Sequence, residues 1–233
     1  MTIQFSHTYR QARISNFKVL IAVLIFLMVS GVLIANSQTA PEFLITWKAS
    51  PYVPSDYQGK ILPTRESVIN ISFDVIDSGK IADLSRNEIR WKSGGKIINS
   101  GIGSKNSSFV ISKIAVDELR INITILNSKG RDLNKSISIP IADPEVVIQQ
   151  IGPASFEAKP YFFNINNVSL LNFDWTANGE KPAGSPKNPN ILTIENLTET
   201  IKTSLGIKLN LGVKATNILN PIENAVGKLI INI

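Results

Sequence analysis

The chain has 233 residues, and its 43% hydrophobic and 18% charged residues are enough to bury a core and exclude a disordered composition. It has no cysteine, and its one histidine, His7, precedes a long apolar segment, which excludes thiolate metal sites and histidine-based catalysis from the rest of the chain. Beyond that segment 21 Lys and Arg face 18 Asp and Glu, too small an excess for a nucleic-acid partner. We therefore expect no nucleic acid, no metal and no small-molecule cofactor.

The first predicted element is a transmembrane anchor at residues 19–35, which read VLIAVLIFLMVSGVLIA and carry no charge. At about 1.5 Å per helical residue this segment spans roughly 26 Å, close to the hydrocarbon thickness of a bilayer. Because Arg10, Arg13 and Lys18 precede it, the positive-inside rule predicts a cytoplasmic tail at 1–18 and an extracytoplasmic remainder. A cleaved secretory signal and a buried core helix are the alternatives.

Beyond a linker at 36–40, the chain alternates apolar and polar residues in several short stretches, as do strands that bury one face. This alternation is found at residues 69–75, 119–125, 137–141, 207–214 and 228–233. The turn residues of 127–130 join the second and third stretches into a predicted hairpin. The region is therefore predicted to be all-β.

The two halves of this region repeat each other. A proline, a glutamate and an apolar residue at 41–43 recur at 144–146. Each half also contains one tryptophan that is followed by a glycine-containing turn, and each closes with a hairpin-like pair of strands. The repeat predicts two domains, residues 41–143 and 144–233.

The tryptophan turns indicate the type of domain. Trp91 is followed by Lys-Ser-Gly-Gly and Trp175 by Thr-Ala-Asn-Gly, each between alternating strands. This pattern resembles Ig-like β-sandwiches and, more closely, the PKD-type domains of membrane-anchored bacterial envelope proteins. The resemblance covers residues 41–233 and implies two tandem Ig-like or PKD-like β-sandwiches after one N-terminal transmembrane helix. PKD turns are rich in aspartate and these are not, so no bound ion is carried over. Both tryptophans are expected in the structural core.

Candidate binding residues are three aromatic side chains of the first half, Trp47, Tyr52 and Tyr57. Residues 51–66 have no counterpart of that length in the second half, and their tyrosines lie among prolines and a glycine. Such an aromatic loop is typical of sites that bind glycans or proteins. The alternative is a loop that covers a sheet edge, with its tyrosines packed on their own sheet. Trp47, beside Lys48, is compatible with either core or surface.

Two other groups of residues have simpler interpretations. Tyr161-Phe162-Phe163 is predicted to be strand, with an interdomain or partner contact as the alternative. Asp74, Asp77 and Asp83 lack the spacing of a calcium loop, and we interpret them as solvated turn residues.

Together these features predict a non-enzymatic, single-pass membrane protein with no catalytic residues. Its β-sandwich ectodomain is expected to act as a binding or spacer module at the cell envelope, for a protein or a glycan. The first alternative is a structural subunit of an envelope or secretion assembly. The remote alternative is a glycan hydrolase with paired carboxylates, since Asp and Glu are the main acid-base residues left.

Overall fold

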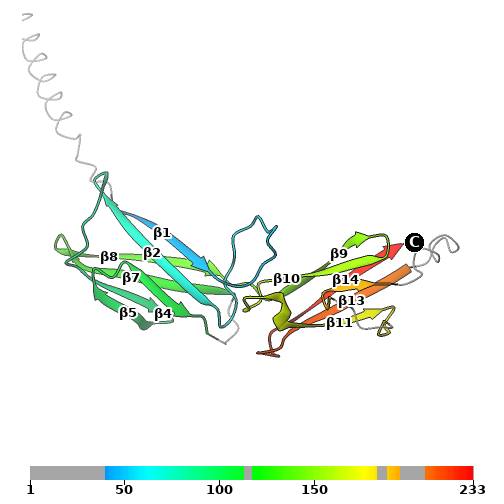
Figure 1. Cartoon of the computed structure of the whole chain (residues 1–233). Coiled ribbons are helices and arrows are strands. Elements are labelled where there is room, and N and C mark those ends of the chain that lie inside the picture. The colour runs from blue at the N-terminus through cyan, green and yellow to red at the C-terminus, as the bar shows by residue number, and fades with distance from the viewer. Residues whose placement is uncertain (1–39, 113–116, 183–187, 195–207, 233) are drawn as a thin grey trace, which may run out of the picture. The chain divides into compact units, whose positions relative to one another are not determined.

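The computed structural model describes residues 40–112, 117–182, 188–194 and 208–232, and Figure 1 shows the strands that they form. Phe43–Val75 and Ile81–Ile233 form one compact unit, and the remaining described residues belong to another. The predicted tail, the anchor at 19–35 and the linker up to residue 39 lie outside the described residues. Within the described ranges, no helix is long and apolar enough to span a membrane.

The described residues form antiparallel strands and one short 3₁₀ turn, η1 (Val168–Leu170). The strands of the first half are β1 (Glu42–Ala49), β2 (Val68–Asp77), β3 (Lys80–Ile81), β4 (Glu88–Ser93), β5 (Lys96–Ile102), β6 (Asn106–Val110), β7 (Glu118–Ser128) and β8 (Arg131–Pro140). Those of the second half are β9 (Glu145–Gly152), β10 (Ser155–Tyr161), β11 (Leu171–Ala177), β12 (Ile191–Thr193), β13 (Lys208–Asn217) and β14 (Asn224–Asn232).

The first half is a sandwich of two sheets. One sheet has the order β1-β2-β3, with β6 also paired to β2, and the other has the order β5-β4-β7-β8. The period-two alternation explains the packing, because Ile69, Ile71 and Phe73 of β2 face inward and are almost completely buried. They form one hydrophobic cluster with residues of the facing sheet, such as Ile121 and Ile123 of β7. The predicted hairpin is the β7–β8 pair.

Among the described residues, the second half repeats this arrangement with fewer strands. Its sheets have the orders β12-β10-β9 and β11-β13-β14, and both contribute to a second hydrophobic cluster. In each half the first two strands pair with each other, and one of them pairs with a later strand of the same sheet. In the other sheet the strand that carries the tryptophan pairs with the next-to-last strand of the half, which pairs in turn with the last. This is the order of an Ig-like sandwich, so the predicted all-β, Ig-like fold is confirmed for the described residues.

The two repeated tryptophans make the same contact in both halves. Trp91 in β4 is 0% exposed and Trp175 in β11 is 5% exposed. The indole Nε1 of Trp91 donates to the main-chain oxygen of Ser104 at 2.9 Å, and that of Trp175 donates to the oxygen of Pro189 at 3.0 Å. Each buried N–H therefore has a partner, which removes the free-energy cost of burying the indole.

Candidate functional site

The Pro51–Glu66 segment contacts the second half at several points. The main-chain N–H of Tyr52 donates to the oxygen of Phe163 at 2.7 Å, and the N–H of Phe162 donates to the oxygen of Tyr52 at 2.8 Å. The ring of Tyr52 packs against the hydrophobic cluster of the second half. Its burial, and then the carboxylates of Glu157 and Asp56, raise the pKa of the Tyr52 hydroxyl above its usual value.

The middle of the segment adds ring and charge contacts. The ring centroid of Tyr57 lies 5.8 Å from those of Tyr161 and Phe162, in edge-to-face geometry. The Nζ of Lys159 lies 2.7 Å from the Oδ2 of Asp56. This hydrogen bond lowers the pKa of the Asp56 carboxyl and raises the pKa of the Lys159 ammonium.

These contacts correct two expectations. Tyr52 and Tyr57 do not pack on their own sheet, because the apolar surface that Tyr161, Phe162 and Phe163 offer lies at the end of β10 in the second half. The predicted strand over these three residues also ends early, at Tyr161. Phe162 has a φ of +58°, which is outside the range of a strand, and the completely buried Phe163 follows it.

The end of the segment lines a pocket of about 380 Å³. Glu66 accepts a hydrogen bond on its main-chain oxygen from Asn164 at 3.2 Å and on Oε2 from Asn220 at 2.9 Å. Glu223, which also lines the pocket, accepts hydrogen bonds from the main chain of Asn164 and the amide of Asn217. Both glutamates of this pocket are therefore engaged by other parts of the chain.

Trp47, the third candidate residue, lies in β1 and packs partly buried against the first hydrophobic cluster. It also lines a hollow of about 530 Å³ on the sheet of β1, β2 and β6. The lining side chains include Trp47 and Lys48 of β1, Asn70 and Ser72 of β2, and Asn106 and Ser108 of β6. The Nζ of Lys60 lies 3.5 Å from the centroid of the Trp47 ring, in cation–π contact.

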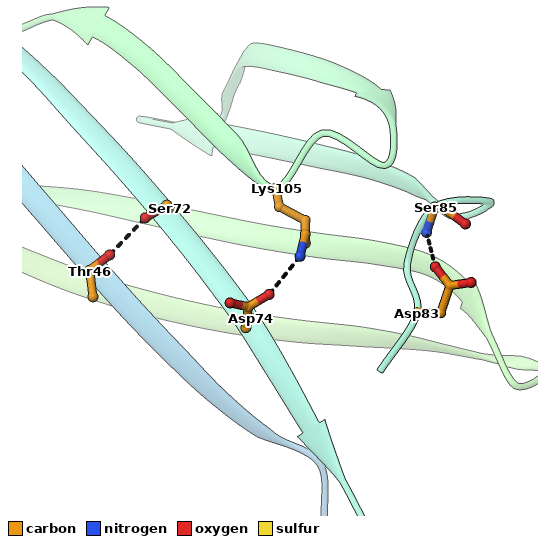
Figure 2. A network of polar contacts seen from close by, with 6 residues as sticks. All are labelled: Thr46, Ser72, Asp74, Asp83, Ser85 and Lys105. Carbon is orange, nitrogen blue, oxygen red and sulfur yellow. Dashed lines mark hydrogen bonds and ion pairs between the residues drawn. The ribbon is translucent and has the colours of Figure 1, made fainter. Parts of the chain in front are cut away.

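The register of these strands forms the hollow. Asn70 lies opposite Ser108, and Ser72 lies opposite Asn106. The hydroxyls of Thr46 and Ser72 are 2.7 Å apart, and Figure 2 shows them pointing toward each other from neighbouring strands. Because these exposed side chains are short, they leave a shallow trough on the outer face of the sheet. Sequence reasoning missed these residues, although the polar positions of the alternating 69–75 stretch are an available signal.

Charged residues next to the hollow are paired. Figure 2 shows Asp74 beside Lys105, whose Nζ lies 2.6 Å from Asp74 Oδ1. Asp74 is therefore a strand residue in an ion pair, and its interpretation as a turn residue was wrong because β2 continues to Asp77. Asp83 lies outside the strands, just before the turn at 85–86, and the main-chain N–H of Ser85 donates to it at 2.9 Å and lowers its pKa. Among the described residues, no group of His, Cys, Asp and Glu could hold a metal ion.

Comparisons with known proteins add little to this geometry. No family model and no curated protein matches the chain. Solved structures with similarity include fibronectin(III)-like modules of Clostridium thermocellum CbhA, at 13% identity over 81% of this chain and 94% of that one, with a TM-score of 0.26. The Ig1-2 module of the Drosophila receptor protein tyrosine phosphatase DLAR has 15% identity over 83% and 99%, with a TM-score of 0.26. Bacteroides ovatus SGBP-B, in complex with a mixed-linkage heptasaccharide, has 12% identity over 84% and 62%, with a TM-score of 0.21. At these scores we rest the fold on strand pairing alone and transfer no function.

Proposed function

We propose that this chain is a single-pass membrane protein whose two Ig-like sandwiches act as an extracytoplasmic binding or spacer module at the cell envelope, without catalysis. The observation that carries the spacer role is the attachment of the Pro51–Glu66 segment to the second half. The membrane part of the proposal is supported by the charge-free residues 19–35 and the basic residues before them.

A spacer needs more than a covalent connection between its domains. Domains that share only a linker move independently, so they cannot hold a binding face at a defined distance from a membrane. Here Tyr52 contributes main-chain hydrogen bonds, Tyr57 contributes ring contacts and Asp56 contributes an ion pair, all to residues 159–163. Together these contacts hold the segment on the second half. Because the segment belongs to the first half, the two halves should unfold together.

Calorimetry of the full-length protein with Asp56→Asn and Tyr57→Ala combined tests this coupling. The parent should unfold in a single cooperative transition, and the double variant in two, because each sandwich would then melt separately. A matched control is Thr124→Ala with Asn134→Ala, which removes an exposed hydrogen bond between β7 and β8 that does not involve the segment. Identical traces for parent and double variant would refute the coupling.

The membrane orientation has its own test. Protease added to intact cells should digest an epitope fused to the C-terminus and spare one fused to the N-terminal tail. The full-length protein should also require detergent for extraction. Recovery of an intact chain in the soluble fraction would refute the anchor.

An assembly subunit is the second candidate, and an exposed apolar turn favours it. Ile218, Leu219 and Ile222 lie between β13 and β14 and are 56%, 75% and 89% exposed. Apolar side chains gathered in one exposed turn are typical of contacts with another chain. Extraction in mild detergent followed by size measurement separates an assembly subunit from a binding or spacer module. An assembly subunit should co-purify in a stable complex, and Ile222→Asn should weaken that complex.

A further inference from the structure

The hollow on the β1–β2–β6 sheet has the chemistry of a carbohydrate site. Asn70, Ser72, Asn106 and Ser108 present amides and hydroxyls, each able to donate and accept hydrogen bonds, on one exposed face. The hydroxyl of Thr46 joins them through Ser72. A polyhydroxylated ligand matches such a surface, because each sugar hydroxyl also donates and accepts.

A protein partner fits this face less well. Protein interfaces are built around buried aromatic and apolar side chains with a polar rim. The apolar lining of the hollow consists of Trp47, which already packs on the core and carries Lys60 on its ring, and Ile71, which is 2% exposed. The centre of the hollow is thus polar, the reverse of a protein interface.

The charge of the hollow selects the kind of carbohydrate. Among the described residues that line it, Lys48 has the only formal charge and its side chain is exposed. Lys60 does not line the hollow, because its ammonium lies on the ring of Trp47, which packs against the core. The neighbouring Lys105 is neutralised by Asp74. One exposed cation without a carboxylate in the lining favours a negatively charged ligand.

The outer face of the opposite sheet provides a contrast. There Arg90 pairs with Glu88 at 2.7 Å and Arg120 pairs with Glu118 at 2.6 Å. The polar side chains of β7 and β8 also bond to each other, as Thr124 does with Asn134 at 2.7 Å. The trough has a hydrogen bond of the same kind between Thr46 and Ser72, so the difference lies in the two carboxylates, which make the opposite face a poor surface for an acidic ligand.

We propose that the trough of Asn70, Ser72, Asn106 and Ser108, with Lys48 beside it, binds an acidic glycan. The amides and hydroxyls contact the sugar hydroxyls, and Lys48 contacts a carboxylate or phosphate group of the ligand. The proposal deepens the proposed function, and depends on it only for placing this face outside the membrane, where such polymers are found.

Isothermal titration of the full-length protein in detergent micelles tests the proposal with three probes. The first is an oligogalacturonate, which carries one carboxylate per sugar, the second is a phosphorylated galactose oligomer, and the third is a neutral galactose oligomer of the same length. We expect binding of at least one acidic probe, and the two acidic probes distinguish a carboxylate from a phosphate ligand. The neutral oligomer should bind at least about tenfold more weakly, since the charge-assisted contact with Lys48 is missing.

Variants locate the site. Asn70→Ala with Asn106→Ala should weaken acidic-probe binding about tenfold or more, and Lys48→Glu should weaken it further while reducing its salt dependence. Ser72→Gln, which fills the trough without adding a charge, gives a second way to block it. The matched control Asn122→Ala with Asn134→Ala, on the opposite sheet, should bind like the parent. Because all these side chains are on the surface, unchanged melting temperatures should show that the variants fold.

Several outcomes would overturn the proposal. One is that the parent binds neither acidic probe, or that it binds the neutral oligomer as tightly as the acidic ones. Another is that the double variant at Asn70 and Asn106 binds the acidic probes as tightly as the parent does. The last is that the trough variants abolish capture of a protein partner while no glycan binds. None of these results bears on the anchor or on the domain coupling, which cell fractionation and calorimetry measure separately. A soluble chain that still binds the acidic probe would refute the membrane proposal alone.

Discussion

Two parts of the chain differ in what their composition suggests and what they contact. They are the Pro51–Glu66 segment and the hollow on the β1–β2–β6 sheet. The segment has the composition of a recognition loop, yet Tyr52 and Tyr57 contact the residues that follow β10. The hollow is lined mostly by short polar residues such as Asn70 and Ser72, and its outer face stays exposed. Aromatic side chains in a long connection are thus as useful for joining two parts of one chain as for holding a ligand.

The energetic difference follows from what each region removes from water. Contacts of the segment bury aromatic rings, which stabilises the folded chain, because burial of apolar area is the main favourable term in folding. The side chains of the hollow remain hydrated, so they contribute little to stability until a ligand replaces the water. Substitutions should accordingly affect stability in the first region and binding in the second.

The largest effect is expected for Phe163→Ala, where the segment meets the second core. The side chain is 0% exposed, so its truncation leaves a cavity and should lower the free energy of unfolding by about 3–5 kcal/mol. Urea unfolding followed by tryptophan fluorescence measures the loss. Ile222→Ala, 89% exposed, is the control and should change stability by less than about 0.5 kcal/mol. A loss no larger than that of the control would contradict the view that the Phe163 side chain supports the second core.

Tyr57→Ala should have a smaller effect, about 1–2 kcal/mol, because it removes two edge-to-face ring contacts from a partly buried site. Tyr57→Phe keeps both rings and loses only a 3.3 Å hydrogen bond from the hydroxyl to the oxygen of Lys60, so it should behave like the parent. The same urea titration compares them. Equal losses in both variants would assign the effect to the hydroxyl rather than to the rings.

The pH dependence of the segment should follow Asp56 and Lys159. The folded pKa of Asp56 is lowered, so its contribution is fully present above the unfolded value of about 3.9 and is lost as pH falls through the folded value. The folded pKa of Lys159 is raised, so its contribution is present below about 10.4 and is lost as pH rises through the folded value.

The raised pKa of Tyr52 adds to the alkaline loss, because the buried hydroxyl resists ionisation only in the folded state. Proteolytic cleavage within the segment, measured from pH 3 to 11, should therefore be slowest between these limits. Asp56→Asn should remove the increase in cleavage rate at acid pH. It should keep the part of the increase at alkaline pH that comes from ionisation of Tyr52. A profile that does not change with this substitution would show that the ion pair has no role in holding the segment.

The smallest effect on stability is expected in the hollow. Asn70→Ala and Ser108→Ala remove exposed polar atoms, so each should shift the free energy of unfolding by no more than about 0.5 kcal/mol. Thermal melting provides the measurement. A loss above about 2 kcal/mol would show that these side chains support the sheet, and the contrast between the two regions would disappear.

Much of the fold follows from the residues alone. Alternation predicted which side of β2 and β7 faces the core, because side chains of a strand point to opposite faces with a period of two. The repeat correctly marked Trp91 and Trp175 as equivalent positions, since both indoles donate to a main-chain oxygen further along their own half. The turn predicted at 127–130 agrees with the positive φ of Lys129 and Gly130 between β7 and β8.

The local sequence determined where strands form and which side of each strand is buried, because neighbouring residues alone set those properties. Only the tertiary structure decided that Tyr52 meets Phe163 and that Thr46, Ser72 and Asn106 share one face. Such contacts depend on which strands pair and in which register, and that depends on the packing of whole sheets over a common core. For this reason the contacts of the 51–66 loop with the second half could not be predicted from the sequence, and neither could the polar face that strands far apart in the chain form together.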